Sequence, residues 1–246
     1  MRARHRHFSY KAAEASIALD ARYINEVSDG TTVETWSDRS GNGRDATQTT
    51  SGNRATYKAA IQGGSGVLRF DGGDFYTATF TTGTAYSAYF ILKRTGGGSN
   101  AFGGVNFIFA AGTSGSTNSN ARRYQMTFDG NASGVFQVLS NATTGTNQTR
   151  NDNWNVHSVS SQIGSGNQSY YLNGGGEVSA SVSSLAGVTS GTVRMTIGER
   201  SWDTSAASLR LNGDVGLIVT YETAHAAPLR KRCEHAAAFS FKISCN

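Results

Sequence analysis

Acidic residues that could serve as a catalytic pair occur between Glu26 and Glu34, a segment that also contains Asp29. Glycoside hydrolysis needs two carboxylates that face one cleft, and on a β-strand only alternate residues share a face. The spacing of Glu26 and Asp29 does not meet this requirement, and Asp29-Gly30 is a dipeptide typical of a turn. We therefore expect a protein that is not an enzyme.

His157 lies in a predicted strand whose residues alternate only in part between apolar and polar. A histidine works as a general acid or base when a neighbouring group orients it or exchanges a proton with it. The sequence around His157 offers no such neighbour, so we interpret it as an ordinary strand histidine.

Sugar recognition is the chemistry that the tryptophans suggest. Trp202 and Asp203 lie in a polar loop between two predicted strands, and Asn153 ends another polar stretch. A sugar site combines an exposed aromatic ring with a few polar groups that bind the hydroxyls. We expect Trp36 and Trp154 to be core anchors and Trp202 to be exposed. Trp202, Asp203 and Asn153 are therefore the candidate glycan-binding residues.

Short runs of aromatic and β-branched residues, separated by Gly, Ser, Asn and Thr clusters, predict an all-β protein. Helices are expected only near the ends, over Lys11–Tyr23 and Ala224–Phe239, and Phe239–Ile243 alternates like a strand. The predicted strands are Thr32–Asp38, Val67–Phe70, Tyr86–Lys93, Asn106–Ala110, Arg123–Phe128, Gly134–Leu139, Trp154–Gln162, Gln168–Leu172, Thr192–Gly198 and Leu209–Tyr221.

Composition agrees with one globular β domain. A length of 246 residues suits a single sandwich or barrel. Thirty glycines without a triplet period, together with one proline, exclude collagen and a proline-rich linker. Charged residues make up 16%, too few for a coiled coil or a charge-driven disordered chain.

The net charge of +5 is carried by the two ends of the sequence, and the middle is slightly acidic. A nucleic-acid-binding domain would show a basic stripe along its body with interleaved aromatic residues, so nucleic acid is not an expected partner. We assign residues 1–16 to a basic N-terminal arm and residues 17–246 to the folded domain. The candidates for anchoring to an acidic partner surface are Arg2, Arg4, Arg6, Arg230, Lys231 and Arg232.

Four segments in order resemble the laminin G-like jelly rolls of the concanavalin A-like lectin/glucanase superfamily. Trp36–Ala46 resembles the opening motif, and Val67–Phe75 resembles its apolar-x-Phe-Asp-Gly strand and turn. Tyr170–Gly174 resembles the aromatic-apolar-Asn-Gly hairpin, for which Asn-Gly suits a type I′ turn, and Asn212–Tyr221 resembles the last strand. The resemblance implies an antiparallel two-sheet jelly-roll sandwich.

The resemblance also implies possible sites. Related sandwiches hold Ca²⁺ at a loop rim, for which Asp38, Asp71 and Asp214 are the candidate ligands. Asp38 and Asp71 are more easily explained as turn formers that bond their own backbone, so the sequence leaves a Ca²⁺ site open and requires no cofactor. The Glu-x-Asp-x-x-Glu strand of the glucanases is absent. Gln125, His157 and Tyr171 match the residue types of the lyase signature without its local motifs.

The basic N-terminus is followed by no apolar segment, so we expect no secretory signal, no membrane span and synthesis in the cytoplasm. Cys233 and Cys245 are then expected to be free thiols. These features favour a non-catalytic, lectin-like structural or adhesion module of a larger assembly, such as a phage-type virion (tail, fibre or capsid decoration). A polysaccharide-processing glucanase or lyase and a free carbohydrate-binding module are the alternatives, and a homo-oligomer is left open.

Overall fold

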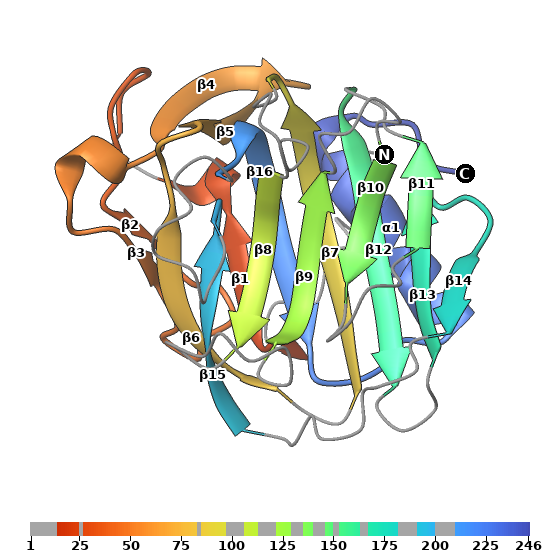
Figure 1. Cartoon of the computed structure of the whole chain (residues 1–246). Coiled ribbons are helices and arrows are strands. Elements are labelled where there is room, and N and C mark those ends of the chain that lie inside the picture. The colour runs from red at the N-terminus through yellow and green to blue at the C-terminus, as the bar shows by residue number, and fades with distance from the viewer. Residues whose placement is uncertain are drawn as a thin grey trace, which may run out of the picture.

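The computed structural model describes residues 14–24, 27–82, 85–96, 106–112, 122–128, 135–139, 146–149, 153–162, 167–181, 191–199 and 210–246. In these residues the chain forms two antiparallel β-sheets that pack face to face, and one α-helix lies on the outer face of one sheet (Figure 1). The predicted fold class, an antiparallel two-sheet sandwich of the jelly-roll type, is confirmed.

The sheet under the helix, called sheet 1, has the strand order β14-β13-β12-β7-β16-β5-β4, and β1 also pairs with β16. Its strands are β1 Ile17–Asp20, β4 Thr56–Gln62, β5 Ser65–Asp71, β7 Ala85–Arg94, β12 Asn155–Gln162, β13 Asn167–Leu172, β14 Val178–Ser181 and β16 Asn212–Tyr221.

The opposite sheet, called sheet 2, has the order β11-β10-β9-β8-β15-β6-β3-β2. Its strands are β2 Thr35–Trp36, β3 Ala46–Thr47, β6 Tyr76–Thr82, β8 Asn106–Gly112, β9 Arg122–Phe128, β10 Val135–Leu139, β11 Thr146–Thr149 and β15 Gly191–Ile197. The helices are the 3-10 turns η2 Ala21–Tyr23 and η3 Ser51–Asn53, and the α-helix α1 Ala227–Phe241.

Strand β16 is covered on both faces, by sheet 2 on one side and by α1 on the other. Val215 and Ile218 belong to the core between the sheets, whereas Leu217 and Val219 belong to the cluster under the helix. The pairing of β16 with β7 shifts between Val215 and Leu217, and this β-bulge reverses which face each following residue occupies. A nearly continuous apolar run is the pattern expected of such a doubly covered strand.

Gly216 lies at this bulge, directly under the end of the helix. A side chain here would collide with the ring of Phe241, which is fully buried. The turn between β4 and β5 holds the same helix end, because Gln62 Nε2 and Ser65 Oγ donate to the carbonyls of Phe241 and Ser240 at 3.0 Å. These bonds satisfy carbonyls that the end of a helix leaves without partners.

The core between the sheets contains the largest buried rings. Trp36, Phe70, Tyr76, Phe90 and Tyr170 are fully buried there, which confirms Trp36 as a core anchor. Trp154 is half-buried and packs at the edge of the cluster under the helix.

The prediction of a helix over Lys11–Tyr23 is wrong for the residues that the structure describes. Ile17–Asp20 form β1, which pairs with β16 from Ile17 opposite Thr220 to Asp20 opposite Leu217. All four residues of β1 are buried, so pairing and burial outweigh the helix propensity of alanine and leucine. Only η2 is helical in this segment.

The second terminal prediction is correct except at its end. Helix α1 continues through Phe241, so the strand-like alternation of Phe239–Ile243 does not produce a strand. Phe239 is 70% exposed and Phe241 is buried, since two residues on a helix are separated by more than half a turn. No helix among the described residues is long and apolar enough to cross a membrane. Cys233 and Cys245 are free thiols.

A buried ion pair fixes α1 on sheet 1. Arg230 Nη1 donates to both carboxylate oxygens of Glu234, at 2.6 and 2.8 Å, and Ser158 Oγ donates to the same carboxylate. The guanidinium carbon of Arg230 lies 3.4 Å from the centre of the Tyr171 ring. The side chain of Arg230 is therefore buried and bonded within the fold.

Replacing Glu234 by Ala should lower the free energy of unfolding by about 3–5 kcal/mol, because Arg230 would keep a buried charge without its carboxylate. The double variant Arg230→Met, Glu234→Leu removes both charges and should recover most of that loss. Urea unfolding followed by circular dichroism measures both effects. A double variant as unstable as Glu234→Ala would contradict this account.

Candidate functional site

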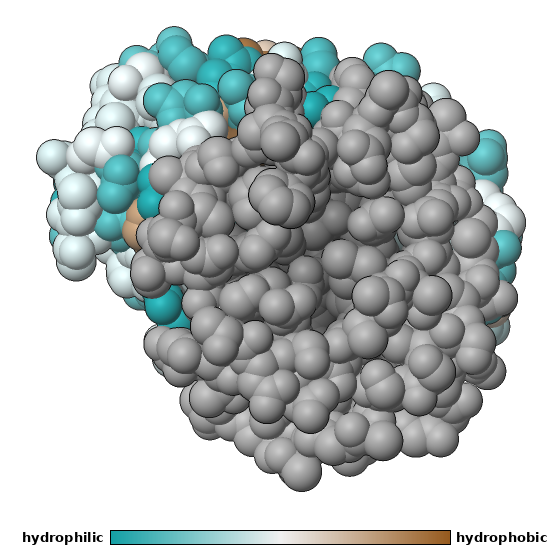
Figure 2. Space-filling view, in the orientation of Figure 1, coloured by the Kyte–Doolittle hydropathy of each residue, from teal (hydrophilic) through white to brown (hydrophobic). Residues whose placement is uncertain are grey.

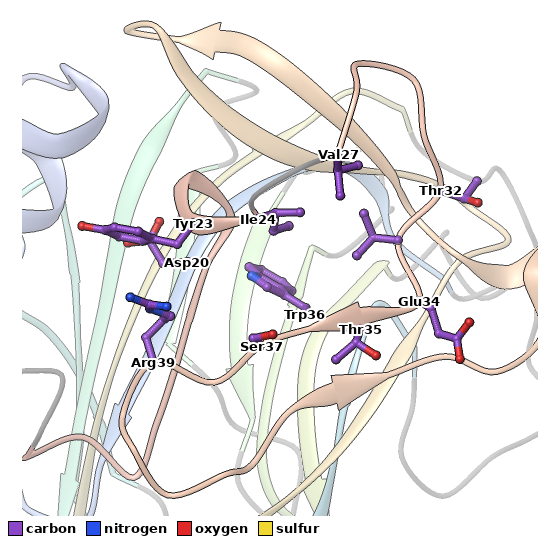
Figure 3. Close-up of a pocket in the computed structure, with 11 residues that line it drawn as sticks. Asp20, Tyr23, Ile24, Val27, Thr32, Glu34, Thr35, Trp36, Ser37 and Arg39 are labelled. Atoms are coloured by element: carbon purple, nitrogen blue, oxygen red, sulfur yellow. The ribbon is translucent and has the colours of Figure 1, made fainter.

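A cavity of about 430 Å³ lies where the chain leaves β1 and passes β2 (Figure 3). This volume falls in the range of small-molecule sites in proteins. Apolar and polar side chains share its wall, and the surface over β2–β4 is mainly hydrophilic (Figure 2). The lining residues are Asp20, Tyr23, Ile24, Val27, Thr32, Val33, Glu34, Thr35, Trp36, Ser37 and Arg39.

Two short pieces of backbone position these side chains. Asp20 caps η2, because its Oδ1 accepts from Arg22 N at 3.0 Å, and this turn leaves Tyr23 exposed. On the other side β2 alternates, so that Trp36 points into the core while Thr35 is exposed. A bridge between Leu19 and Asp38 holds the two segments side by side.

The hydrogen bonds of Asp38 make that bridge rigid. Its carboxylate accepts from Ala18 N at 2.9 Å, from Ser40 N and Oγ at 2.9 and 2.6 Å, and from Arg44 N at 3.1 Å. Burial acts to raise the pKa of Asp38, but the hydrogen bonds from Ser40, Ala18 and Arg44 outweigh it and the pKa is lowered. The turn that follows needs Gly41 and Gly43 at φ of 88° and 67°.

Most charges at the cavity are neutralised within the fold. Arg22 Nε donates to Asp20 Oδ1 at 2.9 Å, and Arg54 Nη2 donates to Glu34 Oε2 at 2.6 Å. The guanidinium of Arg39 forms neither an ion pair nor a hydrogen bond with any described residue. It lies over the ring of Tyr23, with 4.8 Å between its central carbon and the ring centre. Among the described residues that line the cavity, Arg39 therefore carries a positive charge that no carboxylate pairs with.

Trp36 supplies a second unused group. Its side chain is fully buried, and its indole N–H has no acceptor among the described residues. A buried donor without a partner costs free energy, which an acceptor atom of a ligand would recover.

Asn153 is the one described residue among the predicted glycan-binding residues, and it does not line this cavity. Trp202 and Asp203 lie outside the described residues, as do the predicted anchors Arg2, Arg4 and Arg6. Asn153 is exposed just before β12, and its carbonyl accepts from Asn155 Nδ2 at 2.9 Å. Of the other predicted anchors, Lys231 and Arg232 are exposed on α1.

The three candidate Ca²⁺ ligands each have partners of their own within the fold. Asp38 is held as described above, Asp71 Oδ1 accepts from Gly73 N at 2.7 Å, and Asp214 binds Arg69 through two bonds of 2.7 and 2.9 Å. In the part of the chain that the structure describes, no three His, Cys, Asp or Glu side chains are grouped to hold a metal ion.

The described acidic residues that were weighed for catalysis have partners of their own within the fold. Glu26 lies outside the described residues, Asp29 Oδ1 accepts from Ala59 N at 2.8 Å, and Glu34 pairs with Arg54. The side chain of Gln125 is not among those described. Tyr171 packs against Arg230.

His157 is buried in sheet 1, where its Nδ1 lies 2.8 Å from the hydroxyl of Tyr170. Burial lowers the pKa of His157 to about 3. It is a strand histidine inside the protein, away from the cavity.

Solved structures provide the only matches to this chain that were found. No family model matches the sequence, and no curated protein matches it. A Trypanosoma rangeli sialidase in complex with sialic acid superimposes with a TM-score of 0.62 at 12% identity, over 94% of this chain and 34% of the sialidase. The binding domain of botulinum neurotoxin serotype D gives 0.62 at 10% identity, over 92% of this chain and 51% of that one.

The toxin binding domain of serotype D/C gives a TM-score of 0.57 at 12% identity, over 92% of this chain. This chain spans about a third of the sialidase and about half of the toxin domains. The likeness shows a shared β-sandwich fold.

Stability should fall as the pH is lowered below the ordinary histidine pKa of 6.5, because His157 cannot take a proton while it is buried. The contribution of His157 to the free energy of unfolding is complete above pH 6.5. It is lost between pH 6.5 and about 3, by up to about 1.4 kcal/mol per pH unit. His157→Gln should flatten this part of the curve in urea unfolding measured from pH 7.5 to 4.5.

A control variant and the titration of a second buried group allow the change in slope to be assigned to His157. His235→Gln removes an exposed histidine of α1 and should leave the slope unchanged. Burial raises the pKa of Asp74 to about 6, which gives the opposite slope in all three proteins and cancels in the difference. Equal slopes in His157→Gln and the unmodified protein would show that burial does not lower the pKa of His157.

Proposed function

We propose that this protein is a non-catalytic, lectin-like module that binds a saccharide in the cavity beside β2. The combination of apolar and polar side chains in the cavity wall is the main support for this proposal. Ile24, Val27 and Val33 offer apolar surface to the C–H face of a sugar, whereas Thr35 and Ser37 offer hydroxyls to its polar edge. Small-molecule sites combine an apolar wall with a few polar groups in this way.

The use of the described carboxylates supports the non-catalytic part of the proposal. A hydrolase keeps one carboxyl group ready to protonate and another ready to attack or to activate water. Asp20, Asp214 and Glu234 are each bound to an arginine, and Asp38 accepts four hydrogen bonds. These groups hold the fold together.

The solved structures that share the fold are compatible with a binding role. Two of them are toxin binding domains, and a third was solved with sialic acid. Because identity is 10–12%, the fold alone is common to them, and the saccharide-binding role of this chain is our proposal.

We place this module in a larger assembly, with a phage-type virion (tail, fibre or capsid decoration) as the setting. Lys231 and Arg232, exposed on the outer side of α1, and the basic N-terminal arm are suited to an acidic surface of another subunit. Mass spectrometry of purified particles from the source organism should detect the chain. Particles that lack it would remove the virion setting but not the binding role.

On a glycan array the protein should bind at least one class of saccharide. Tyr23→Ala removes the exposed ring at the cavity and should weaken that binding, whereas Phe239→Ala removes an even more exposed ring on α1 and should not. Incubation with β-glucans and alginates should release neither reducing sugar nor unsaturated product.

Three results would contradict parts of this proposal. A blank array would remove saccharide binding, and released product would remove the non-catalytic assignment. Binding that survives Tyr23→Ala but is lost in Trp202→Ala would move the site to the loop of Trp202.

A further inference from the structure

The charged side chains at the cavity differ in whether they already have a partner within the fold. Asp20 and Glu34 already have arginine partners, so neither carboxylate is left to attract a cation. The carboxylate of Asp38, next to Arg39 in sequence, is occupied by backbone and serine donors. Among the described lining residues the remaining charge is that of Arg39, and a ligand with a negative group would compensate it.

The ring of Tyr23 positions the guanidinium of Arg39 for binding a ligand. The ring lies against the guanidinium of Arg39 at 4.8 Å and that of Arg22 at 5.4 Å, and Arg22 is fixed by Asp20. A guanidinium over an aromatic ring keeps its N–H groups at its edge, where they can form two parallel bonds to a carboxylate. Figure 3 shows Arg39 beside Tyr23 at one end of the cavity.

The unused N–H of Trp36 adds a second requirement. An indole nitrogen donates and cannot accept, so its partner must be an acceptor atom. The ring of Trp36 lies between Arg39 and the apolar residues Ile24 and Val27 in Figure 3. A fitting ligand thus has acceptor atoms and a negative group at one end and C–H surface at the other.

Resting on the proposed saccharide-binding function, we infer that the cavity selects carboxylated sugars, with Arg39 binding the carboxylate and Trp36 donating to a sugar oxygen. A planar carboxylate fits one guanidinium through two bonds. A phosphate or sulfate group has three oxygens to satisfy, and no second cation without a carboxylate partner lines the described wall. The carboxylate is therefore the better match.

Matched sugars test this selection. Glucuronate differs from glucose, and galacturonate from galactose, by the carboxylate at C6, and NMR titration of the full chain measures each affinity. At low salt the uronates should bind about tenfold more tightly than the neutral sugars, since hydrogen bonds to charged groups are the stronger ones. Higher ionic strength should reduce this preference, because Arg39 is exposed.

Variants assign the effect to residues. Arg39→Gln should abolish the preference for uronates, and Arg39→Lys should keep part of it because the charge remains. Arg232→Gln removes an exposed arginine on α1 and should change nothing. Trp36→Phe keeps an aromatic ring in the core but lacks the donor, and it should weaken uronates and neutral sugars alike. Thermal unfolding checks that each variant is folded.

The outcomes separate this inference from the proposed function. Binding of neutral sugars and uronates with equal affinity, unchanged in Arg39→Gln, would overturn the inference and leave saccharide binding intact. Tighter binding of glucose 6-sulfate than of glucuronate would overturn the assignment to a carboxylate. Failure of every sugar on the array to bind would overturn both.

Discussion

The backbone of β16 must be hydrogen-bonded on both edges and covered on both faces, and this constraint organises the described part of the molecule. A buried N–H or C=O without a partner is costly, so a central strand needs a neighbour along its whole length. On one edge β7 provides it. On the other edge β5 pairs with Asn212–Val215 and β1 pairs with Leu217–Thr220.

Along this edge of β16 the neighbouring strand changes from β5 to β1 at the bulge around Gly216. The position of the cavity follows from this change. Strand β5 occupies this edge of β16 from Asn212 to Val215. Strand β1 must therefore leave the sheet after Asp20, which lies opposite Leu217. Asp20 caps the turn that begins there, and the chain passes over the end of β2. A cavity between Tyr23, Trp36 and Arg39 is thus a consequence of how the central strand is paired.

Much of the fold could be predicted from the sequence because its central strands are strongly apolar. The predicted Tyr86–Lys93 and Leu209–Tyr221 correspond to β7 and β16, and Asn173-Gly174 forms the expected turn with both φ angles positive. The strands β3, β4, β6, β11 and β14 were not predicted. Strand β4 has no clear apolar alternation, since much of it is exposed. In β6 the apolar residues Tyr76, Ala78 and Phe80 do alternate with threonines, and this signal in the sequence was missed.

The cavity could be predicted only in part. Trp36 belongs to a motif that the sequence displays, but Tyr23 and Arg39 are far apart along the chain and meet through the bridge of Leu19 to Asp38. Their contact depends on β1 being a strand, and the alanine-rich sequence there predicts a helix. Asp38 was a candidate metal ligand by residue type alone. Three of its four donors are backbone N–H groups that the fold brings around it, and the fourth is the hydroxyl of Ser40.

The described arginines differ in whether the guanidinium pairs with a carboxylate of the fold, and this difference bears on function. Arg22, Arg54, Arg69, Arg210 and Arg230 each bind a carboxylate and connect segments or fix turns. The guanidinium of Arg39 pairs with no carboxylate among the described residues and lies over the ring of Tyr23, which is exposed beside the cavity. Its N–H groups form no hydrogen bond with a described residue, so they can bind a ligand. An arginine that the fold does not use, beside a buried donor that the fold does not satisfy, is the physical reason to look for an acceptor-rich anion at this place.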